Sequence, residues 1–447
     1  MTERNDRRTV TLLAMLLLVL TVPRSVRGET APVPEVEPPT PASLEEPAPA
    51  DDGPPPVPDR PRLEIQSGDG QSSIRFQLAV QLQYYFQNVD RGPNADREND
   101  DAVIFRRIRP VISGSLLTES LTYRLHLNLV PGALELMDFW FNYRFHAQAQ
   151  MLVGQNKVPF TRYRLDSFQD TPLVDWSNPT RFFGAERQLG VMLHNDVSRP
   201  PRWEYQLGVY TGDNARASNG VGLSRTYGET PANPSNLTDP APPSGFHPEI
   251  VAHLGYNHPD MNVRRPSDLE GGPLRYSFGL SAAWDIRPTP TEDWALRLAP
   301  EVLIKAHGFM AQGVFYAAFW DDVATDDSFA LGAVAALLQT SYVIRRRVEI
   351  ALRYSLVHIT EDLRNDARTR ADGIIADAAD DEEAEALTRR YASVGHVIRE
   401  HELNLGVTVY AVATTLKLAI DGGLLGHERD DGTRWDFRLR TQAQLAF

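Results

Sequence analysis

The chain has 447 residues, with 59 acidic residues against 45 basic ones, a formal net charge of −14 and no cysteine. This acidic balance argues against nucleic acid as a partner. The lack of cysteine excludes disulfides, thiolate metal sites and a lipid anchor on an N-terminal cysteine. After the first thirty residues no run of about 20 apolar residues occurs, so a mature chain in a membrane would have to cross it as strands.

The first 28 residues predict a secretory signal peptide. Arg4, Arg7 and Arg8 precede an apolar run from Val10 to Val22, and small residues stand before a cleavage point after Gly28. An uncleaved signal anchor is the alternative, but this run is too short to span a bilayer. Residues 29–62 contain twelve prolines and several acidic residues, which predict a disordered periplasmic linker, either an inert spacer or a tether toward the cell wall.

Residues 74–87 alternate strictly between apolar and mostly polar side chains, with Ile74, Leu78 and Phe86 among the apolar set. A period of two places all the apolar side chains on one face of a strand. Strands of soluble sheets average about 5–6 residues, whereas a transmembrane strand needs about 9–11. The segment therefore predicts a membrane-spanning strand with one face toward lipid and one toward a polar lumen.

Sixteen segments of this kind divide the chain from residue 74 to its end, and residues 63–447 are predicted to form one all-β, transmembrane antiparallel barrel. They lie near 74–87, 103–116, 121–130, 134–146, 148–157, 187–196, 203–211, 248–257, 274–287, 293–305, 308–320, 329–344, 347–359, 398–411, 414–425 and 433–447. The last segment alternates up to the terminal Phe447, as the closing strand of a bacterial outer-membrane barrel does. Sixteen strands leave room for an aqueous channel.

The connections give an independent argument for a barrel. With a periplasmic N-terminus, the long connections 88–102, 158–186, 212–247 and 360–397 all fall on the extracellular side, and 258–273 is the one long periplasmic connection. A soluble β-sandwich explains neither this asymmetry nor the strand lengths. Segments 308–320 and 329–344 depart from the pattern because both faces are apolar or small, which fits either a subunit interface or packing under an inserted loop.

Several motifs resemble the phosphate-selective porin O and P family. They are Phe105–Pro110 with Ser113–Gly114, Asp138–Tyr143, Val153–Phe160, Arg187–Val191 and Gly406–Tyr410. The resemblance implies an outer-membrane porin of sixteen strands, usually trimeric, with the third extracellular loop folded into the pore. The chain departs from the phosphate-selective members, which carry lysine clusters, because it has only three lysines. A proline-rich linker replaces the coiled-coil segment that many members carry.

Strand alternation assigns a mixed set of charged side chains to the lumen face, with basic residues slightly ahead. The assigned residues are Arg75, Arg107, Arg109, Arg124, Arg144, Arg275, Arg297, Lys305, Arg353, Lys417, Arg438 and Arg440, and the acids Asp138, Glu204, Asp285, Glu301, Glu349, Glu402, Asp421 and Asp436. Each alone is expected to be solvated lining.

The third extracellular connection supplies the candidate constriction. Arg162 and Arg164, with Arg107 and Arg109 nearby, could form a basic rim for oxyanions, and Arg181 and Arg187 are further candidates. Six aromatic residues could fix this loop to the inner wall: Phe160, Tyr163, Phe168, Trp176, Phe182 and Phe183. Lys157 is also a candidate, although its parity with Met151 and Val153 directs it toward lipid unless a bulge shifts the register.

The seventh connection carries acidic residues from Asp380 to Glu385 and then Arg389 and Arg390, which favours a short surface helix. Cation-mediated bridging from this helix to lipopolysaccharide is the alternative.

Together these features predict a Gram-negative outer-membrane porin for passive diffusion of small hydrophilic solutes and ions, with a mild preference for anions such as phosphate. The expected partners are these solutes, outer-membrane lipid and lipopolysaccharide, and two further copies in a homotrimer. We expect no cofactor, metal or catalytic residue. The alternatives are a closed barrel that serves as receptor or structural anchor, and an outer-membrane enzyme, for which the eleven histidines form no recognisable nucleophile motif.

Overall fold

The computed structural model describes residues 63–90, 96–130, 133–184, 187–212, 248–289, 292–322, 327–376, 378–391 and 396–447. All of them belong to one compact unit, Pro56–Phe447. The predicted signal peptide (1–28), the whole of the linker (29–62) and most of the connection 212–247 lie outside the described residues.

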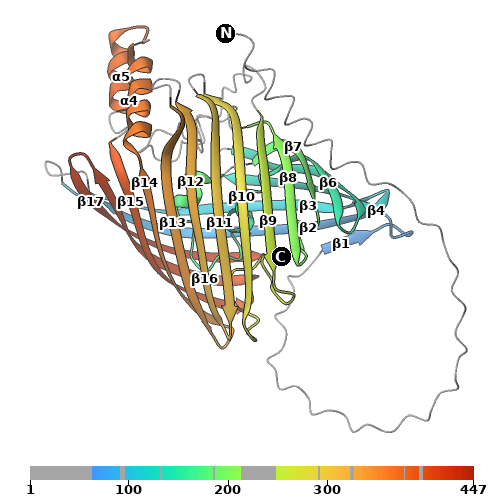
Figure 1. Ribbon diagram of the computed structural model, residues 1–447. Coiled ribbons are helices and arrows are strands. Elements are labelled where there is room, and N and C mark those ends of the chain that lie inside the picture. The colour runs from blue at the N-terminus through green and yellow to red at the C-terminus, as the bar shows by residue number, and fades with distance from the viewer. Residues whose placement is uncertain are drawn as a thin grey trace, which may run out of the picture. The chain divides into compact units, whose positions relative to one another are not determined.

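Sixteen antiparallel strands form a closed barrel in which each strand pairs with the next and the last pairs with the first (Figure 1). In chain order they are β2 (Ser73–Val89), β3 (Glu98–Leu116), β4 (Thr118–Val130), β5 (Ala133–His146), β6 (Ala149–Lys157), β7 (Arg187–His194), β8 (Trp203–Tyr210), β9 (Glu249–Asn257), β10 (Arg275–Thr289), β11 (Glu292–Ala306), β12 (Phe309–Asp322), β13 (Asp327–Ile344), β14 (Val348–Ile359), β15 (Val397–Val412), β16 (Leu416–Arg429) and β17 (Gly432–Ala446). The prediction of sixteen strands is confirmed, with ends displaced by a few residues.

A seventeenth strand, β1 (Leu63–Gln66), was not predicted. It pairs with residues 73–76 of β2, next to the point where Phe447 exchanges backbone hydrogen bonds of 2.8 and 3.0 Å with Leu78. β1 therefore continues the β2 edge where β17 ends. Four residues are too few for a periodic signal, which explains why the sequence did not reveal it.

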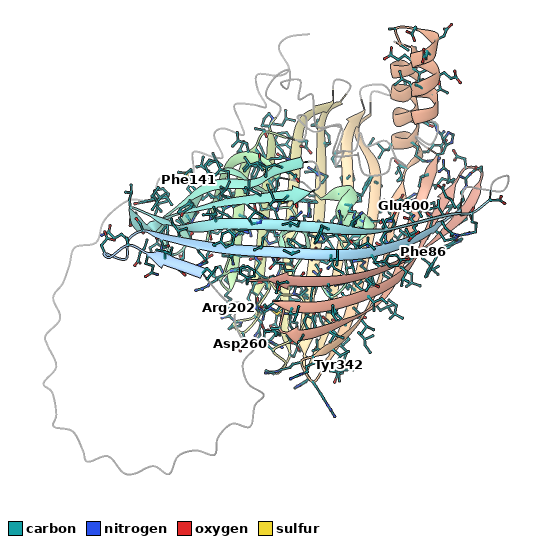
Figure 2. The ribbon with its side chains drawn as sticks, turned by 180° about the vertical axis from the view of Figure 1, so that it is seen from behind. Phe86, Phe141, Arg202, Asp260, Tyr342 and Glu400 are labelled. Atoms are coloured by element: carbon teal, nitrogen blue, oxygen red, sulfur yellow. The ribbon has the colours of Figure 1, made fainter. Side chains whose placement is uncertain are left out.

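The predicted facing of the strands is also confirmed, and Figure 2 shows side chains extending on both sides of the wall. In β2, Ile74 and Leu82 are 52% and 42% exposed on the outer face, whereas Gln81 and Gln83 are buried inside. In β17, Trp435 and Leu445 lie outside, and Arg440, Gln442 and Gln444 lie inside. The barrel thus has an apolar outer surface and a polar interior.

The seventh connection forms a helical hairpin of α4 (Glu361–Ala376) and α5 (Asp381–Tyr391), which rises above the strand ends in Figure 1. The predicted surface helix corresponds to α5. Asp430, in the turn between β16 and β17, holds the base of the hairpin through Arg364 at 2.8 Å and Arg368. No helix in the described part of the chain is long and apolar enough to cross a membrane.

The apolar inner faces of β12 and β13 pack against the third connection, which lies inside the barrel. Val314 and Tyr316 of β12 and Leu337 of β13 are buried in one cluster with Phe160 and Phe183 of that connection. Of the two explanations offered for segments 308–320 and 329–344, packing under an inserted loop therefore explains their apolar inner faces.

Candidate functional site: the loop-lined lumen

The third connection, between β6 and β7, is described over residues 158–184 and is folded into the lumen, as the family resemblance implied. Two short helices shape it, α2 (Arg162–Leu165) and α3 (Asn178–Phe183). The side chain of Thr161 caps α2 by accepting from the Arg164 N–H at 3.3 Å, and Ser177 caps α3 in the same way. The loop is anchored, as predicted, by buried aromatic side chains: Phe183 stacks on Tyr316 with ring centroids 5.1 Å apart.

Charged residues of the wall hold the loop through its backbone. Loop N–H groups donate to three wall carboxylates: Arg162 to Glu301 at 2.7 Å, Val174 to Asp421 at 2.9 Å and Asn178 to Glu402 at 2.9 Å. Three wall cations donate to loop carbonyls: Arg353 to Asp175 at 2.7 Å, Arg297 to Phe183 at 2.9 Å and Lys417 to Thr171 at 2.9 Å. These residues come from β11 and β14–β16, so the loop lies against that side of the barrel.

Several predicted pore-lining residues are therefore inside the barrel but occupied. Arg297 and Arg353 hold the loop and also pair with acids, Arg353 with Glu402 at 3.2 Å. Glu349 accepts from Ser267 at 2.8 Å and from Ser341 at 2.6 Å, and Arg275 pairs with Asp268 at 2.5 Å. These charges fix inner segments of the chain.

Arg162, a predicted rim residue, points from the loop toward Glu204 of β8 and Glu301 of β11 in the barrel wall. It is 3% exposed, its Nη1 donates to Asn257 at 3.1 Å, and its Nε lies 3.4 Å from Glu204 and 3.5 Å from Glu301. Two carboxylates thus surround this guanidinium on the wall side. The structure brings Arg107, Arg109 and Arg164 together without Arg162.

Three arginines of β3, Arg106, Arg107 and Arg109, contact the third loop. A register shift between Gln81 and Leu82 of β2 leaves Arg106 as an extra residue, so that Arg106 and Arg107 both reach the loop. Asp175 of the loop receives Arg106 at 3.2 Å, Arg107 at 3.5 Å and Arg181 at 2.5 Å. Parity had assigned only Arg107 and Arg109 to the lumen, and no sequence signal marked the bulge that adds Arg106.

Two loop aromatics underlie this basic cluster. The guanidinium of Arg109 lies 4.7 Å from the ring centroid of Phe168, and that of Arg107 lies 4.9 Å from the same centroid. Trp176 contacts Arg164 at 4.5 Å and Arg107 at 5.5 Å. Cation–π contacts of this kind hold guanidinium groups in place without neutralising them.

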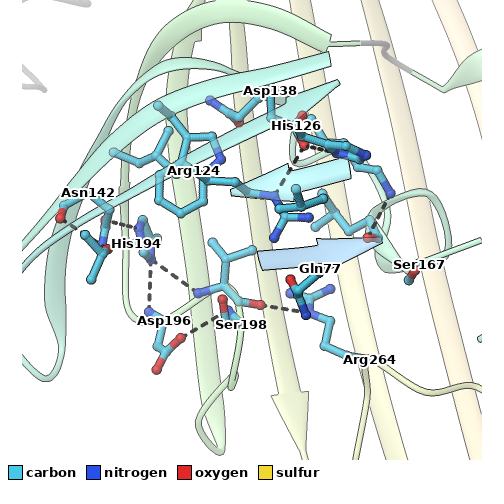
Figure 3. Close-up of a pocket in the computed structure, with 18 of the residues that line it drawn as sticks. Gln77, Arg124, His126, Asp138, Asn142, Ser167, His194, Asp196, Ser198 and Arg264 are labelled. Atoms are coloured by element: carbon cyan, nitrogen blue, oxygen red, sulfur yellow. Dashed lines mark hydrogen bonds and ion pairs between the residues drawn. The ribbon is translucent and has the colours of Figure 1, made fainter. Parts of the chain in front are cut away.

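A cavity of about 740 Å³ lies between the loop and the wall formed by β2–β8 (Figure 3). Its charged lining comprises six cations, Arg109, Arg124, Arg144, Lys157, Arg187 and Arg264, and four acids, Glu119, Asp138, Asp170 and Asp196. Six of the predicted lining and rim residues meet in this cavity: Arg109, Arg124, Asp138, Arg144, Lys157 and Arg187. Arg75 lies outside it and pairs with Glu64 of β1 at 3.0 Å.

Asp138 is the acid in the cavity that is most fully surrounded by donors. It accepts from Arg187 at 2.6 Å, lies 2.7 Å from Nδ1 of His126 and lies 3.7 Å from Arg124. One carboxylate thus faces two guanidinium groups and an imidazole. This part of the cavity wall keeps a net positive charge.

Strand parity directed the candidate Lys157 toward lipid, but its side chain points inward to the third loop. It is the last residue of β6, and its Nζ donates to the carbonyls of Arg164, Leu165 and Asp166 at 3.1, 3.1 and 2.9 Å. The strand alternation ends here, because the chain turns inward to begin the loop and the side chain follows the loop backbone. Its partner in β7, Arg187, also points inward.

Two buried loop carboxylates have opposite protonation properties. Burial raises the pKa of Asp166 to about 8; Arg264 opposes the rise and Glu301 adds to it. Burial alone would also raise the pKa of Asp175, but Arg181, Arg106 and Arg107 hold it well below its usual range. At neutral pH the loop therefore presents a charged Asp175 within the arginine cluster and a largely protonated Asp166.

A sixteen-stranded barrel with an apolar outer surface, a charged lumen and an inward-folded third loop defines the class of outer-membrane porins. The family model of the phosphate-selective porin O and P family matches residues 76–244, which confirms the resemblance indicated by the motifs in that part of the chain. No curated protein matches the sequence.

Two solved structures are similar to the whole barrel. The outer membrane channel DcaP of Acinetobacter baumannii is 12% identical with a TM-score of 0.52, covering 86% of this chain and 99% of that one. An anion-selective porin from Comamonas acidovorans is 12% identical with a TM-score of 0.51, covering 84% and 100%. At this identity the likeness shows the fold alone.

Proposed function

We propose that the chain is a passive diffusion channel of the outer membrane for small hydrophilic solutes, with a preference for anions. The charge of the cavity beside β2–β8 carries this proposal: six cations line it against four acids, and one of these acids, Asp138, is surrounded by donors. Opposite charges of the wall raise the local concentration of a permeating ion and lower its barrier to passage. Passive diffusion requires no catalytic step.

The proposed selectivity residues differ in part from those suggested by sequence alone. Arg109 and Arg187 line the cavity, and Arg107 shares the Phe168 ring with Arg109, whereas the charge of Arg162 is opposed by Glu204 and Glu301. The chain also carries few lysines, so we propose a general anion preference rather than specific phosphate capture. The anion-selective porin from Comamonas acidovorans has the same fold, which is compatible with this assignment.

Replacing Arg107 and Arg109 together with Ala tests the proposal. The double variant should lower the permeability of chloride relative to potassium, because it removes two positive charges at the wall where Phe168 of the loop contacts β3. Reversal potentials in a salt gradient across a planar bilayer measure this ratio. Arg399→Ala is the matched control, since Arg399 is exposed and pairs with Glu428 at 3.0 Å. An unchanged ratio in the double variant would contradict the proposal.

We also propose that residues 1–28 direct export, that 29–62 form a periplasmic linker and that three copies assemble. β1 supports the periplasmic placement of the linker. This strand directly follows the linker and pairs with the first residues of β2. The trimer rests on the family resemblance. N-terminal sequencing of the mature protein should begin near Glu29, and light scattering of the detergent-solubilised protein should give three times the chain mass. A monomer by light scattering would exclude the trimer.

A further inference from the structure

The periplasmic connection between β9 and β10, residues 258–273, is folded into the barrel instead of extending below it. Met261 and Val263 are buried against Leu303 of β11 and Met310 of β12. Further along, Leu269 is buried with Val343 and Tyr410. This turn therefore covers the inner face of β11–β15 at the periplasmic end of the lumen.

Polar contacts fix the turn at several points. Lys305 of β11 donates to the carbonyl of Asn262 at 2.8 Å and to that of Arg265. Asp268 pairs with Arg275 at 2.5 Å and accepts from the Gly308 N–H at 2.8 Å. The Ser267 hydroxyl donates to Glu349 at 2.8 Å. The turn is consequently a fixed part of the lumen wall.

Arg264 extends from this turn toward the neighbouring turn of the barrel. Its Nε donates at 2.8 Å to the carbonyl of Val197, which belongs to the turn between β7 and β8. Figure 3 shows Arg264 at the cavity with Asp196 and Ser198 of that second turn. Arg264 thus connects two periplasmic turns across the end of the cavity.

The charge of Arg264 has no direct acidic partner in the described part of the chain. Its Nη1 and Nη2 atoms are buried and make no hydrogen bond there. The carboxylate oxygens of Asp166 are likewise buried without a hydrogen-bond partner. A buried carboxyl without direct donors is kept in its neutral form, so Asp166 does little to compensate Arg264. The carboxylate of Glu204 also acts on Arg264, but it is shared with Arg162 at 3.4 Å and His253 at 3.0 Å.

We propose that the turn 258–273 forms a second constriction at the periplasmic exit of the lumen and that Arg264 is its specificity-determining residue, favouring small anions. The third loop fills the lumen beside β11 and β14–β16, and the turn covers the wall below it, so solutes are confined to the cavity beside β2–β8. They pass Arg109 first and Arg264 second. This inference rests on the proposed diffusion function.

Arg264→Ala and Arg265→Ala form a matched pair for the test. Arg265 is the next residue, pairs with Glu270 at 3.5 Å and does not line the cavity. In planar bilayers, Arg264→Ala should lower the chloride-to-potassium permeability ratio by about ten-fold, because one unit charge a few ångströms away in water changes the passage of each ion by about three-fold and in opposite directions. Arg265→Ala should leave the ratio unchanged, and Arg264→Lys should retain most of it.

Chemical modification supplies a second readout that does not depend on the alanine variant. The chain has no cysteine, so Arg264→Cys introduces a single thiol. A cationic methanethiosulfonate reagent should restore the anion preference of this variant, and an anionic reagent should lower it further.

The outcomes separate this inference from the function on which it rests. A wild-type chain without open channels would overturn the proposed function. A conducting, anion-preferring wild type with the same ratio in Arg264→Ala, or with no effect of thiol charge in Arg264→Cys, would overturn the second constriction alone.

Discussion

Lumen arginines that look equivalent in the sequence have two different roles. Arg297 and Arg353 hold the inserted loop, whereas Arg107 and Arg109 rest on loop aromatics beside the cavity. Alternation correctly predicted that all four face inward, because facing depends only on strand parity. It could not predict pairing, since the partners lie far away in the chain: Arg162 meets a carboxylate at position 301.

Departures from parity occur where the strands are interrupted. Arg106 faces inward because of a bulge, and Lys157 does so because β6 ends there. Neither event leaves a mark in the alternation of a single sequence. The candidate site was thus predictable in its location, at the third loop, and only partly in its residues.

Asp166 should make the selectivity depend on pH. With its pKa raised to about 8, this carboxyl is largely neutral at pH 6 and ionises as the pH rises through 8. Its charged neighbours are Arg264, Lys157, Arg162 and Glu301. Ionisation adds a negative charge near the passage, so the chloride-to-potassium permeability ratio of the wild type should fall between pH 7 and pH 9.

The variant Asp166→Asn isolates this effect. It keeps the size of the side chain and cannot ionise, so its permeability ratio should stay nearly constant over the same pH range. Reversal potentials at each pH supply the measurement. The same fall in wild type and variant would assign the pH response to another group.

At the scale of elements, the sequence predicted the sixteen strands well because each is long and periodic. Inserted segments obey no such periodicity, yet they left indirect signals. The apolar inner faces of β12 and β13 departed from the pattern because Phe160, Tyr163 and Phe183 pack on them. The connection 258–273 is longer than the other periplasmic turns, and its additional residues fold into the barrel. Its contact with Lys305 involves backbone carbonyls, which side-chain patterns do not reveal.

The anchors of the third loop can be tested separately from the barrel. Arg353→Met removes the hydrogen bond to the Asp175 carbonyl and the pair with Glu402, although Glu402 keeps Arg438 at 2.8 Å. Because Glu402 keeps this second partner, the loss should cost less than the about 3–5 kcal/mol of a buried charge left without any partner. The loop should therefore leave its position part of the time, which should raise single-channel conductance and its noise.

The control for this variant is Arg399→Met, which changes an exposed arginine outside the loop contacts. Its conductance should equal that of the wild type. Wild-type conductance and noise in Arg353→Met would show that the remaining contacts suffice to hold the loop.

Strand register can be tested with single cysteines in this cysteine-free chain. Leu78→Cys and Leu439→Cys should resist water-soluble thiol reagents in a bilayer because these positions face lipid. Gln77→Cys and Arg438→Cys should react because their side chains face the lumen. Labelling yields measured by mass spectrometry decide the matter, and a reversed pattern would mean that the register is displaced by one residue.

At the scale of the whole molecule, closure of the barrel depends on the contact between its two ends. β17 pairs with β2 over residues 437–446, and Phe447 adds two backbone hydrogen bonds to Leu78. A closed barrel leaves no unpaired strand edge in the membrane and therefore resists detergent unfolding. The first and last strands of the barrel, β2 and β17, were predictable from the sequence, whereas the additional strand β1 was not.

Deleting Phe447 should impair assembly. The deletion removes the terminal aromatic and both hydrogen bonds to Leu78 at the seam. The wild type should migrate faster on an unheated gel than on a heated one, and the truncated chain should show less of the fast-migrating form. Phe447→Tyr should behave like the wild type, since it keeps the backbone contacts and an aromatic ring. Equal folded fractions for all three would contradict this role.

Single-channel recording of the purified, refolded chain in planar bilayers tests the central claim most directly. A cavity lined by six cations and four acids lies beside the inserted loop, so we predict discrete open steps and a reversal potential in a potassium chloride gradient that shows chloride preference. Bilayers that stay silent, although the inserted protein is folded by its gel mobility, would contradict the account and favour a closed barrel that serves as a receptor or anchor.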